Sequence, residues 1–171
     1  MDRPYNAVRR EHVIDVAYRD FCTAFEARLG VMDFEALSHL PGGSPADGRR
    51  KLEQCVGASG FALFHKVDHG ALLTTLGGRA TRARTYVFGN PLIAVEMTRF
   101  APVVGLYVPP RLYVSARDDE RTVVTYDVPS ATVAQFGSPQ ADRVAAGLDE
   151  KIEALIADAA RAARQAASSD A

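Results

Sequence analysis

Residues 65–69 place two histidines and an aspartate within one short stretch, a combination suited to proton transfer. Histidine titrates near neutral pH, and a neighbouring carboxylate can hold its tautomer, so Asp68 and His69 form a candidate acid–base pair. Adjacent strand residues point to opposite faces, so direct contact requires the strand to have ended. If the protein is an enzyme, we predict His69 as its general acid–base residue.

His65 and His69 are also candidate metal ligands, because they lie four positions apart. A three-ligand site would need Asp68 or Glu96 to join them in the fold, and nothing here has the spacing of known zinc motifs. We therefore predict no metal site. The structural alternatives are a hydrogen-bonded histidine at the core edge for His65 and a capping or turn role for His69.

The segment from Tyr86 to Phe100 changes from a strand pattern to a helix pattern at Gly-Asn-Pro. Gly89 permits a sharp turn, Asn90 has the residue type of an N-cap, and Pro91 suits the first helical position. Backbone N–H groups at such a helix start can hold an anion or a polar ligand. Asn90 is therefore either a ligand-binding residue or simply the cap, and capping alone explains its residue type.

Other catalytic signatures are missing from the sequence. It contains no Gly-x-Ser-x-Gly elbow, no phosphate loop with its lysine and no dinucleotide fingerprint. Cys22 and Cys55 match no metal spacing, and we expect buried free thiols, with a single disulfide or a reactive Cys55 as the alternatives. These patterns leave any cofactor unidentified.

Composition limits the partners. The 171 residues are 47% hydrophobic, which is enough for the core of a single domain spanning 1–171. Lys and Arg total 20 against 21 for Asp and Glu, so charge gives no general reason to bind nucleic acid. Arg82 and Arg84 indicate a solvated strand edge first and an anion site second. No apolar run reaches the length of a membrane span, and we predict a cytoplasmic protein.

Hydrophobic periodicity predicts a mixed α+β chain. Residues 7–16 fit a first strand and residues 18–29 an amphipathic helix. Residues 40–48 are rich in glycine and proline and predict a mobile surface loop that leads into a further helix. Residues 61–67 alternate as a half-buried strand, with His65 on the same face as Phe61, Leu63 and Val67.

The second half of the chain continues this alternation. We predict a short helix over 69–77, a strand over 82–88, a helix from Pro91 to about Phe100, strands over 106–116 and 121–128 joined at 118–120, and a helix from Gln140 to about Ala167. Pro109 and Pro110 interrupt the first strand of that hairpin, as expected at an edge, bend or bulge. The tail at 165–171 is expected to fray.

Several of these segments together resemble a bacterial family, domain of unknown function 302. The resemblance rests on GFALFHKVDHG, YVFGNPLIAVEM, LYVPPRLYV and VTYDVPS between residues 60 and 130, and on LDEKIEALI at 148–156. It implies a TATA-binding-protein-like α+β fold, an antiparallel sheet with helices packed on one face, often paired as a homodimer. It implies no activity, and it supplies no catalytic residue.

Three functions follow as hypotheses. The first is a small-molecule-binding protein with a pocket between sheet and helices. Its candidate lining residues are His65, His69, Tyr86, Asn90, Met97 and Tyr107. The second is an enzyme that uses His69 as general acid–base in that pocket, with Asn90 or its helix N–H groups stabilising an anion. The third is a structural module whose sheet makes a homodimer without a ligand.

Overall fold

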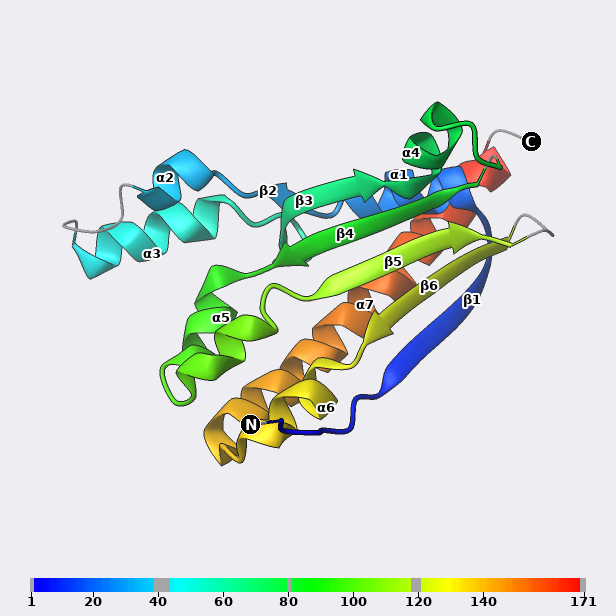
Figure 1. Cartoon of the computed structure of the whole chain (residues 1–171). Coiled ribbons are helices and arrows are strands. Elements are labelled where there is room, and N and C mark those ends of the chain that lie inside the picture. Colours follow the sequence, from blue (N-terminus) through cyan, green and yellow to red (C-terminus); the bar gives the residue numbers. More distant parts are fainter. Residues whose placement is uncertain (1, 39–43, 80, 118–120, 170–171) are drawn as a thin grey trace.

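The computed structural model describes residues 2–38, 44–79, 81–117 and 121–169, and its centre is a six-stranded sheet (Figure 1). The strand order is β1-β6-β5-β4-β3-β2. The strands are β1 (Arg9–Ala17), β2 (Gly30–Val31), β3 (Ala62–Asp68), β4 (Ala83–Gly89), β5 (Arg111–Ala116) and β6 (Arg121–Asp127). All neighbours pair antiparallel except β2, which pairs parallel with β3. The predicted α+β class is confirmed.

Helices connect and cover these strands. They are α1 (Tyr18–Glu26), α2 (Phe34–Ser38), α3 (Pro45–Gln54), α4 (His69–Thr75), α5 (Pro91–Thr98), α6 (Pro129–Val133) and α7 (Pro139–Ser169), with 3₁₀ turns η1 (Pro102–Leu106) and η2 (Ala134–Phe136). The long helix α7 runs behind the sheet in Figure 1, and α1 packs against it. Among the described helices, none is long and apolar enough to cross a membrane.

The hydrophobic core lies between the sheet and the layer formed by α1 and α7. Helix α7 contributes the predicted apolar stripe, of which Leu148, Ile152 and Leu155 are buried. Aromatic side chains of α1 meet the sheet, since the Phe25 ring lies 5.1 Å from the ring of Tyr86. The buried residues of α7 recur at helical spacing and form a stripe, whereas those of the strands alternate along the chain. The stripe packs against the apolar face of the strands, and this face is the inner face of the sheet.

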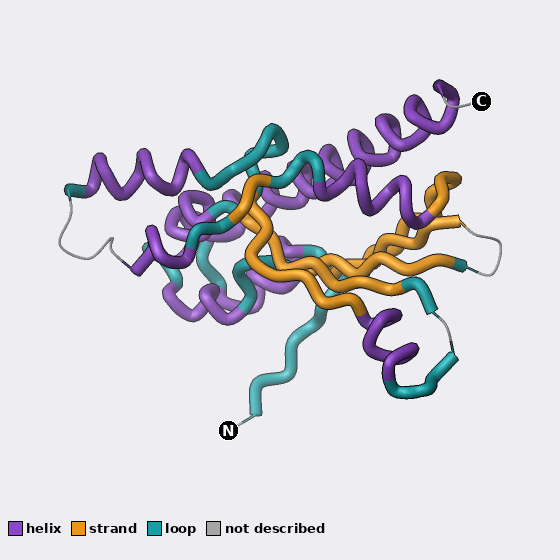
Figure 2. Tube along the Cα trace, turned by 90° about the horizontal axis from the view of Figure 1, so that it is seen from above, coloured by secondary structure: helices purple, strands orange, loops and turns teal. Residues whose placement is uncertain are grey.

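The opposite face of the sheet is left open by α1 and α7, as the view in Figure 2 shows. Thr85, Tyr113 and Thr125 form a row across β4, β5 and β6, because each is the register partner of the next. Helix α4 lies on this open side, where the His69 Nε2 atom is 3.0 Å from the Thr85 hydroxyl. Helices α1 and α7 therefore pack on the inner face, whereas α4 covers the open face only at one end.

A bulge in β3 changes the predicted facing of its side chains. Leu63 pairs with Phe88, whereas His65 pairs with Val87, so one extra residue is inserted between the two pairs. Phe88 and Val87 are consecutive and point to opposite faces, and Leu63 and His65 must do so as well. The predicted common face for these two residues is therefore wrong, because simple alternation does not allow for the inserted residue.

The predicted strand over 106–116 is shorter than expected. Strand β5 begins only at Arg111, after a 3₁₀ turn that ends at Leu106 and a cis peptide bond between Val108 and Pro109. Proline donates no hydrogen bond to a strand ladder, which explains why the pairing starts after Pro110. The proline pair forms the expected bend.

Two segment boundaries also differ from the sequence prediction. Residues 45–48, which the sequence places in a loop, form the first turn of α3, with Pro45 at the helix start and the Ser44 side chain as its cap. The residues predicted to fray at 165–169 are helical in α7. The loop residues 39–43 and the end of the tail at 170–171 lie outside the described part of the chain.

Candidate functional site

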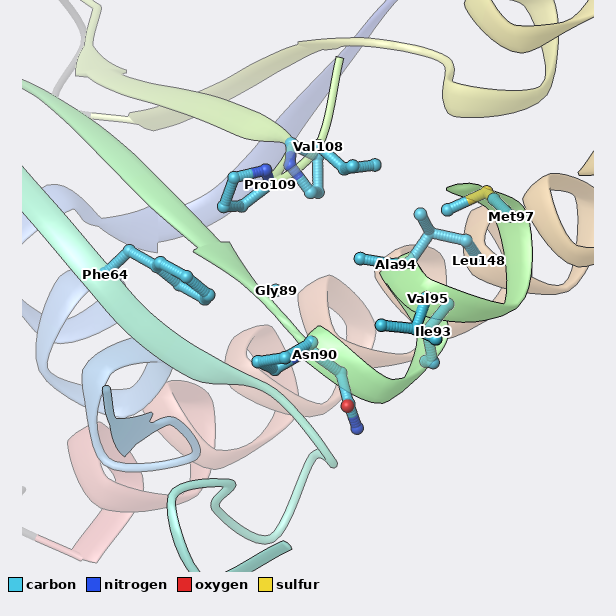
Figure 3. Close-up of a pocket in the computed structure, with 12 residues that line it drawn as sticks. Phe64, Gly89, Asn90, Ile93, Ala94, Val95, Met97, Val108, Pro109 and Leu148 are labelled. Atoms are coloured by element: carbon cyan, nitrogen blue, oxygen red, sulfur yellow. The ribbon is translucent and has the colours of Figure 1, made fainter. Parts of the chain in front are cut away.

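An apolar pocket of about 280 Å³ lies at the start of α5, between the sheet and the helices (Figure 3). We call it the α5 pocket. It is lined by Phe64, Gly89, Asn90, Pro91, Ile93, Ala94, Val95, Met97, Val108, Pro109, Pro110 and Leu148. The lining thus combines β3, the β4–α5 junction, the proline bend and α7. The Asn90 amide is the polar group among these lining side chains. The others are hydrocarbon, except for the weakly polar thioether of Met97.

The Gly-Asn-Pro junction shapes this pocket. A Cβ atom at Gly89 would lie 3.1 Å from Pro109 Cβ, so glycine lets the end of β4 approach the proline bend. The Asn90 side-chain oxygen accepts a hydrogen bond from the Leu92 N–H at 2.9 Å, and Pro91 occupies the first helical turn. Helix α5 therefore starts where the strand ends and presents its first turn to the pocket.

The Asn90 amide bonds the protein backbone through both its oxygen and its nitrogen. Besides capping α5, its Nδ2 group donates a hydrogen bond to the carbonyl of Gly60 at 2.9 Å. The oxygen and one of the two N–H donors of the amide are used, and the group points away from the apolar side chains in Figure 3. The arrangement agrees with the capping interpretation of Asn90 and directs the amide away from the apolar lining of the pocket.

We expect Asn90→Ala to lower the free energy of unfolding by about 2 kcal/mol, because both the cap and the Gly60 hydrogen bond are lost. Asn90→Asp keeps the cap but removes the donor, so its cost should be smaller than that of Asn90→Ala. Urea denaturation followed by circular dichroism measures both. Equal costs for the two variants would show that the cap contributes nothing.

A polar cluster lies next to the core, around the carboxylate of Glu26 at the end of α1. Glu26 accepts hydrogen bonds from the Tyr86 hydroxyl at 2.7 Å and the Lys66 ammonium at 2.8 Å. Arg84 lies 3.3 Å from the same carboxylate and donates to Asp68 at 2.9 Å. These residues come from α1, β3 and β4, so the cluster ties the helix layer to the sheet.

The cluster shifts the titration of its members. Burial acts to raise the pKa of Glu26, but hydrogen bonds from Lys66 and Tyr86 outweigh it, and the pKa is lowered. A hydrogen bond from the Ala71 backbone N–H, with the pairing to Arg84, lowers the pKa of Asp68. Both carboxylates are therefore held ionised, which suits a structural ion-pair network better than a proton donor.

Glu153 on α7 is the centre of a similar cluster on the same face of the sheet, at the opposite edge formed by β1 and β6. It accepts a hydrogen bond from Arg10 at 2.7 Å, lies 3.1 Å from His12 Nε2 and also bonds the Tyr126 hydroxyl. Neither cluster is predicted from the sequence. Their members are up to 143 positions apart, and no local pattern connects them.

The structure separates most of the predicted site residues. Asn90 and Met97 meet at the α5 pocket. Tyr86 is buried in the Glu26 cluster, and Tyr107 contacts the ring of Tyr5 beyond the proline bend. His65 is exposed on β3, opposite Val87 on the open face.

His69 and Asp68 do not form an acid–base pair. The strand ends at Asp68, whose side chain caps α4 by accepting from the Ala71 N–H at 2.8 Å and also binds Arg84. The His69 ring lies on the open face, with Thr85 and, at 6.1 Å between ring centres, Tyr113. The Asp68 carboxylate thus binds Ala71 and Arg84 instead of His69. His69 is the first residue of α4, directly after the cap residue Asp68.

The described residues form neither a metal site nor a site with a reactive cysteine. Within the described ranges, no group of at least three His, Cys, Asp or Glu side chains is placed to hold a metal ion. Cys22 is buried, Cys55 is half-buried, and both are free thiols. Burial raises the pKa of Cys22, which keeps that thiol protonated and unreactive.

Comparisons with known proteins place the chain in a family. The crystal structure of an uncharacterized conserved DUF302 protein from Bacillus stearothermophilus matches with a TM-score of 0.63 at 15% identity, covering 88% of this chain and 97% of that chain. This likeness shows a shared fold. No curated protein matches the sequence. Residues 38–159 match the family model described as domain of unknown function DUF302, and the chain therefore belongs to this family.

Proposed function

We propose that the protein binds a small, uncharged, apolar molecule in the α5 pocket. The single observation that carries this proposal is the apolar lining of a pocket of about 280 Å³ between the sheet and the helices. Ligand sites of proteins are concave and mostly apolar, and their known volumes begin at roughly this size, about 300 Å³.

The lining supports an uncharged ligand. The lining amide of Asn90 already accepts from Leu92 and donates to Gly60. A charged or strongly polar ligand would lose its water without gaining a hydrogen-bond partner, which costs several kcal/mol on the scale of about 2–7 kcal/mol for such groups. An apolar ligand would instead gain the burial of its own surface.

The volume limits the ligand to a compact molecule. An apolar cavity of about 150 Å³ is enough for benzene in a protein core. A pocket of about 280 Å³ is therefore suited to a two-ring hydrocarbon or a branched chain of similar size. Met97 in the lining has an adaptable thioether side chain, which can follow ligands of different shape.

We expect the uncharged, two-ring fluorescent probe 1-aminonaphthalene to bind wild-type protein saturably, and Ala94→Phe to weaken this binding at least tenfold, about 1.4 kcal/mol. Ala94 lines the pocket, and a phenyl group there would occupy the ligand's volume. A fluorescence titration measures the affinity.

The matched control is Ala71→Phe, which adds the same ring at an exposed position of α4 and should leave the probe affinity unchanged. Thermal unfolding of both variants verifies that they are folded. Absence of saturable binding to wild type, or equal binding by folded Ala94→Phe, would rule out this pocket as the binding site.

The enzyme hypothesis receives less support. His69 lies on the open face and Asn90 at the α5 pocket, so the two proposed catalytic groups belong to different surfaces. A general base must come within hydrogen-bond reach of the bound substrate. His69 is therefore not placed to act as general base on a ligand in the α5 pocket.

A homodimeric structural module remains a second candidate, favoured by the surface of α4. Leu72 and Leu73 on this short helix and Leu76 at its C-cap are all exposed, and apolar side chains gathered on one surface are typical of protein contacts. A second copy of the chain is the partner that we propose for them. Light scattering distinguishes a mass of 18.5 kDa from twice that value and so separates the monomer from the dimer.

A further inference from the structure

A second hollow lies on the open face of the sheet, on the other side of the proline bend from the α5 pocket. It has a volume of about 580 Å³, and its lining includes Tyr5, Val87, Tyr107, Arg111 and Asp127. We call it the Arg111 cleft. An adjoining hollow of about 350 Å³ shares Arg111 and Asp127 with it. Unlike the α5 pocket, the cleft combines aromatic rings with charged groups.

Among the described residues, one cation of this cleft has no charged partner. Arg9 and Asp127, which line these hollows, form an ion pair at 3.0 Å between Arg9 Nε and the carboxylate. The Arg111 guanidinium forms no hydrogen bond or ion pair with side chains in the part of the chain that the structure describes, although its backbone pairs with Val87 in the sheet. Since the pair is neutral, the cleft has an excess of one positive charge.

Aromatic and aliphatic side chains surround this cation. The rings of Tyr5 and Tyr107 meet edge to face at 5.8 Å, and both line the cleft with Val87. Tyr113 is exposed in the adjoining hollow. A flat apolar body can pack on such rings, while a guanidinium binds a planar carboxylate through two parallel hydrogen bonds.

We propose that the Arg111 cleft binds an organic carboxylate with a flat aromatic body, the carboxylate pairing with Arg111 and the body lying on the tyrosines. The excess of one charge favours a monoanion over a phosphate, which carries a charge close to −2 at neutral pH. This site is separate from the α5 pocket and does not depend on the function proposed for it.

A matched series of probes tests the charge of the ligand: 2-naphthamide, 2-naphthoate and 2-naphthyl phosphate. We expect 2-naphthoate to bind most tightly in a fluorescence or NMR titration, because only it matches both the flat body and the single charge. Arg111→Gln should weaken 2-naphthoate binding roughly tenfold, as for the loss of a charged hydrogen bond, and leave the weak binding of the amide unchanged.

Two control variants test whether 2-naphthoate binds at the Arg111 cleft itself. Arg117→Gln removes the same charge at an exposed position beyond the end of β5 and should not change the affinity. Ala94→Phe fills the α5 pocket and should also leave 2-naphthoate binding intact. Equal binding of amide and carboxylate, tighter binding of the phosphate, unchanged binding by Arg111→Gln, or no saturable binding of 2-naphthoate would each overturn the assignment.

Discussion

Gly57→Ala is expected to lower the free energy of unfolding by about 3 kcal/mol or more. A Cβ atom at this position would lie 2.4 Å from the Gly30 nitrogen and 2.6 Å from the Arg28 carbonyl oxygen. Both are backbone atoms, so no side chain can move aside. The N–H groups of Gly30 and Gly57 also donate to the same Phe61 carbonyl, each at 2.9 Å, which fixes the two segments against each other.

The same substitution at Gly147 should have the opposite sign. A Cβ atom there meets nothing within 4 Å, and the position lies inside α7. Alanine is favoured over glycine in a helix interior by roughly 1 kcal/mol, so Gly147→Ala is expected to stabilise the protein by up to that amount. Urea denaturation of both variants measures the difference. A neutral Gly57→Ala would contradict the close approach of the two backbone segments.

Local patterns predict a large part of this fold. The apolar stripe of α7 repeats at helical spacing over residues 144–159, and the structure buries Leu148 and Ile152 as expected. The change from strand to helix at Asn90 is encoded by three consecutive residues with distinct backbone preferences. Both features depend on neighbours in the sequence, which is why the sequence alone is sufficient to predict them.

Features that depend on distant contacts were missed. The bulge in β3 is set by its pairing with β4, and nothing within the strand distinguishes it from simple alternation. The pocket lining joins residues from 64 to 148, so sequence analysis found Asn90 and Met97 but not Phe64 or Leu148. The Glu26 hydrogen bond to Tyr86 spans 60 positions and leaves no local signal either.

Glu26→Ala is expected to cost about 3 kcal/mol of unfolding free energy. The Tyr86 side chain is fully buried, and its hydroxyl would lose its acceptor. Lys66 and Arg84 would lose a carboxylate partner at the same time. The control is Glu96→Ala, because Glu96 forms an exposed ion pair with Arg99 and such pairs contribute at most about 1 kcal/mol. Equal costs for the two variants would contradict a stabilising role for the Glu26 cluster.

Acid should weaken the Glu26 cluster. The pKa of Glu26 in the folded protein lies below its ordinary value of 4.5, since hydrogen bonds from Lys66 and Tyr86 outweigh the effect of burial. Ionisation therefore favours the folded state, and this stabilisation is complete above the unfolded pKa and lost as the pH falls through the folded pKa. Wild-type protein should lose unfolding free energy between about pH 6 and pH 3.

Glu26→Gln cannot titrate at this position, so its loss of stability over the same pH interval should be smaller than that of wild type. The pKa of Glu153 is also lowered, because hydrogen bonds from Tyr126 and Arg10 outweigh burial there, but Glu153 is present in both proteins and its contribution cancels in the comparison. The remaining difference in the pH dependence of the unfolding free energy is due to Glu26 and the groups bonded to it. Parallel stability profiles for the two proteins would mean that other carboxylates cause the acid sensitivity, and that the tie between α1 and the sheet does not depend on a charged Glu26.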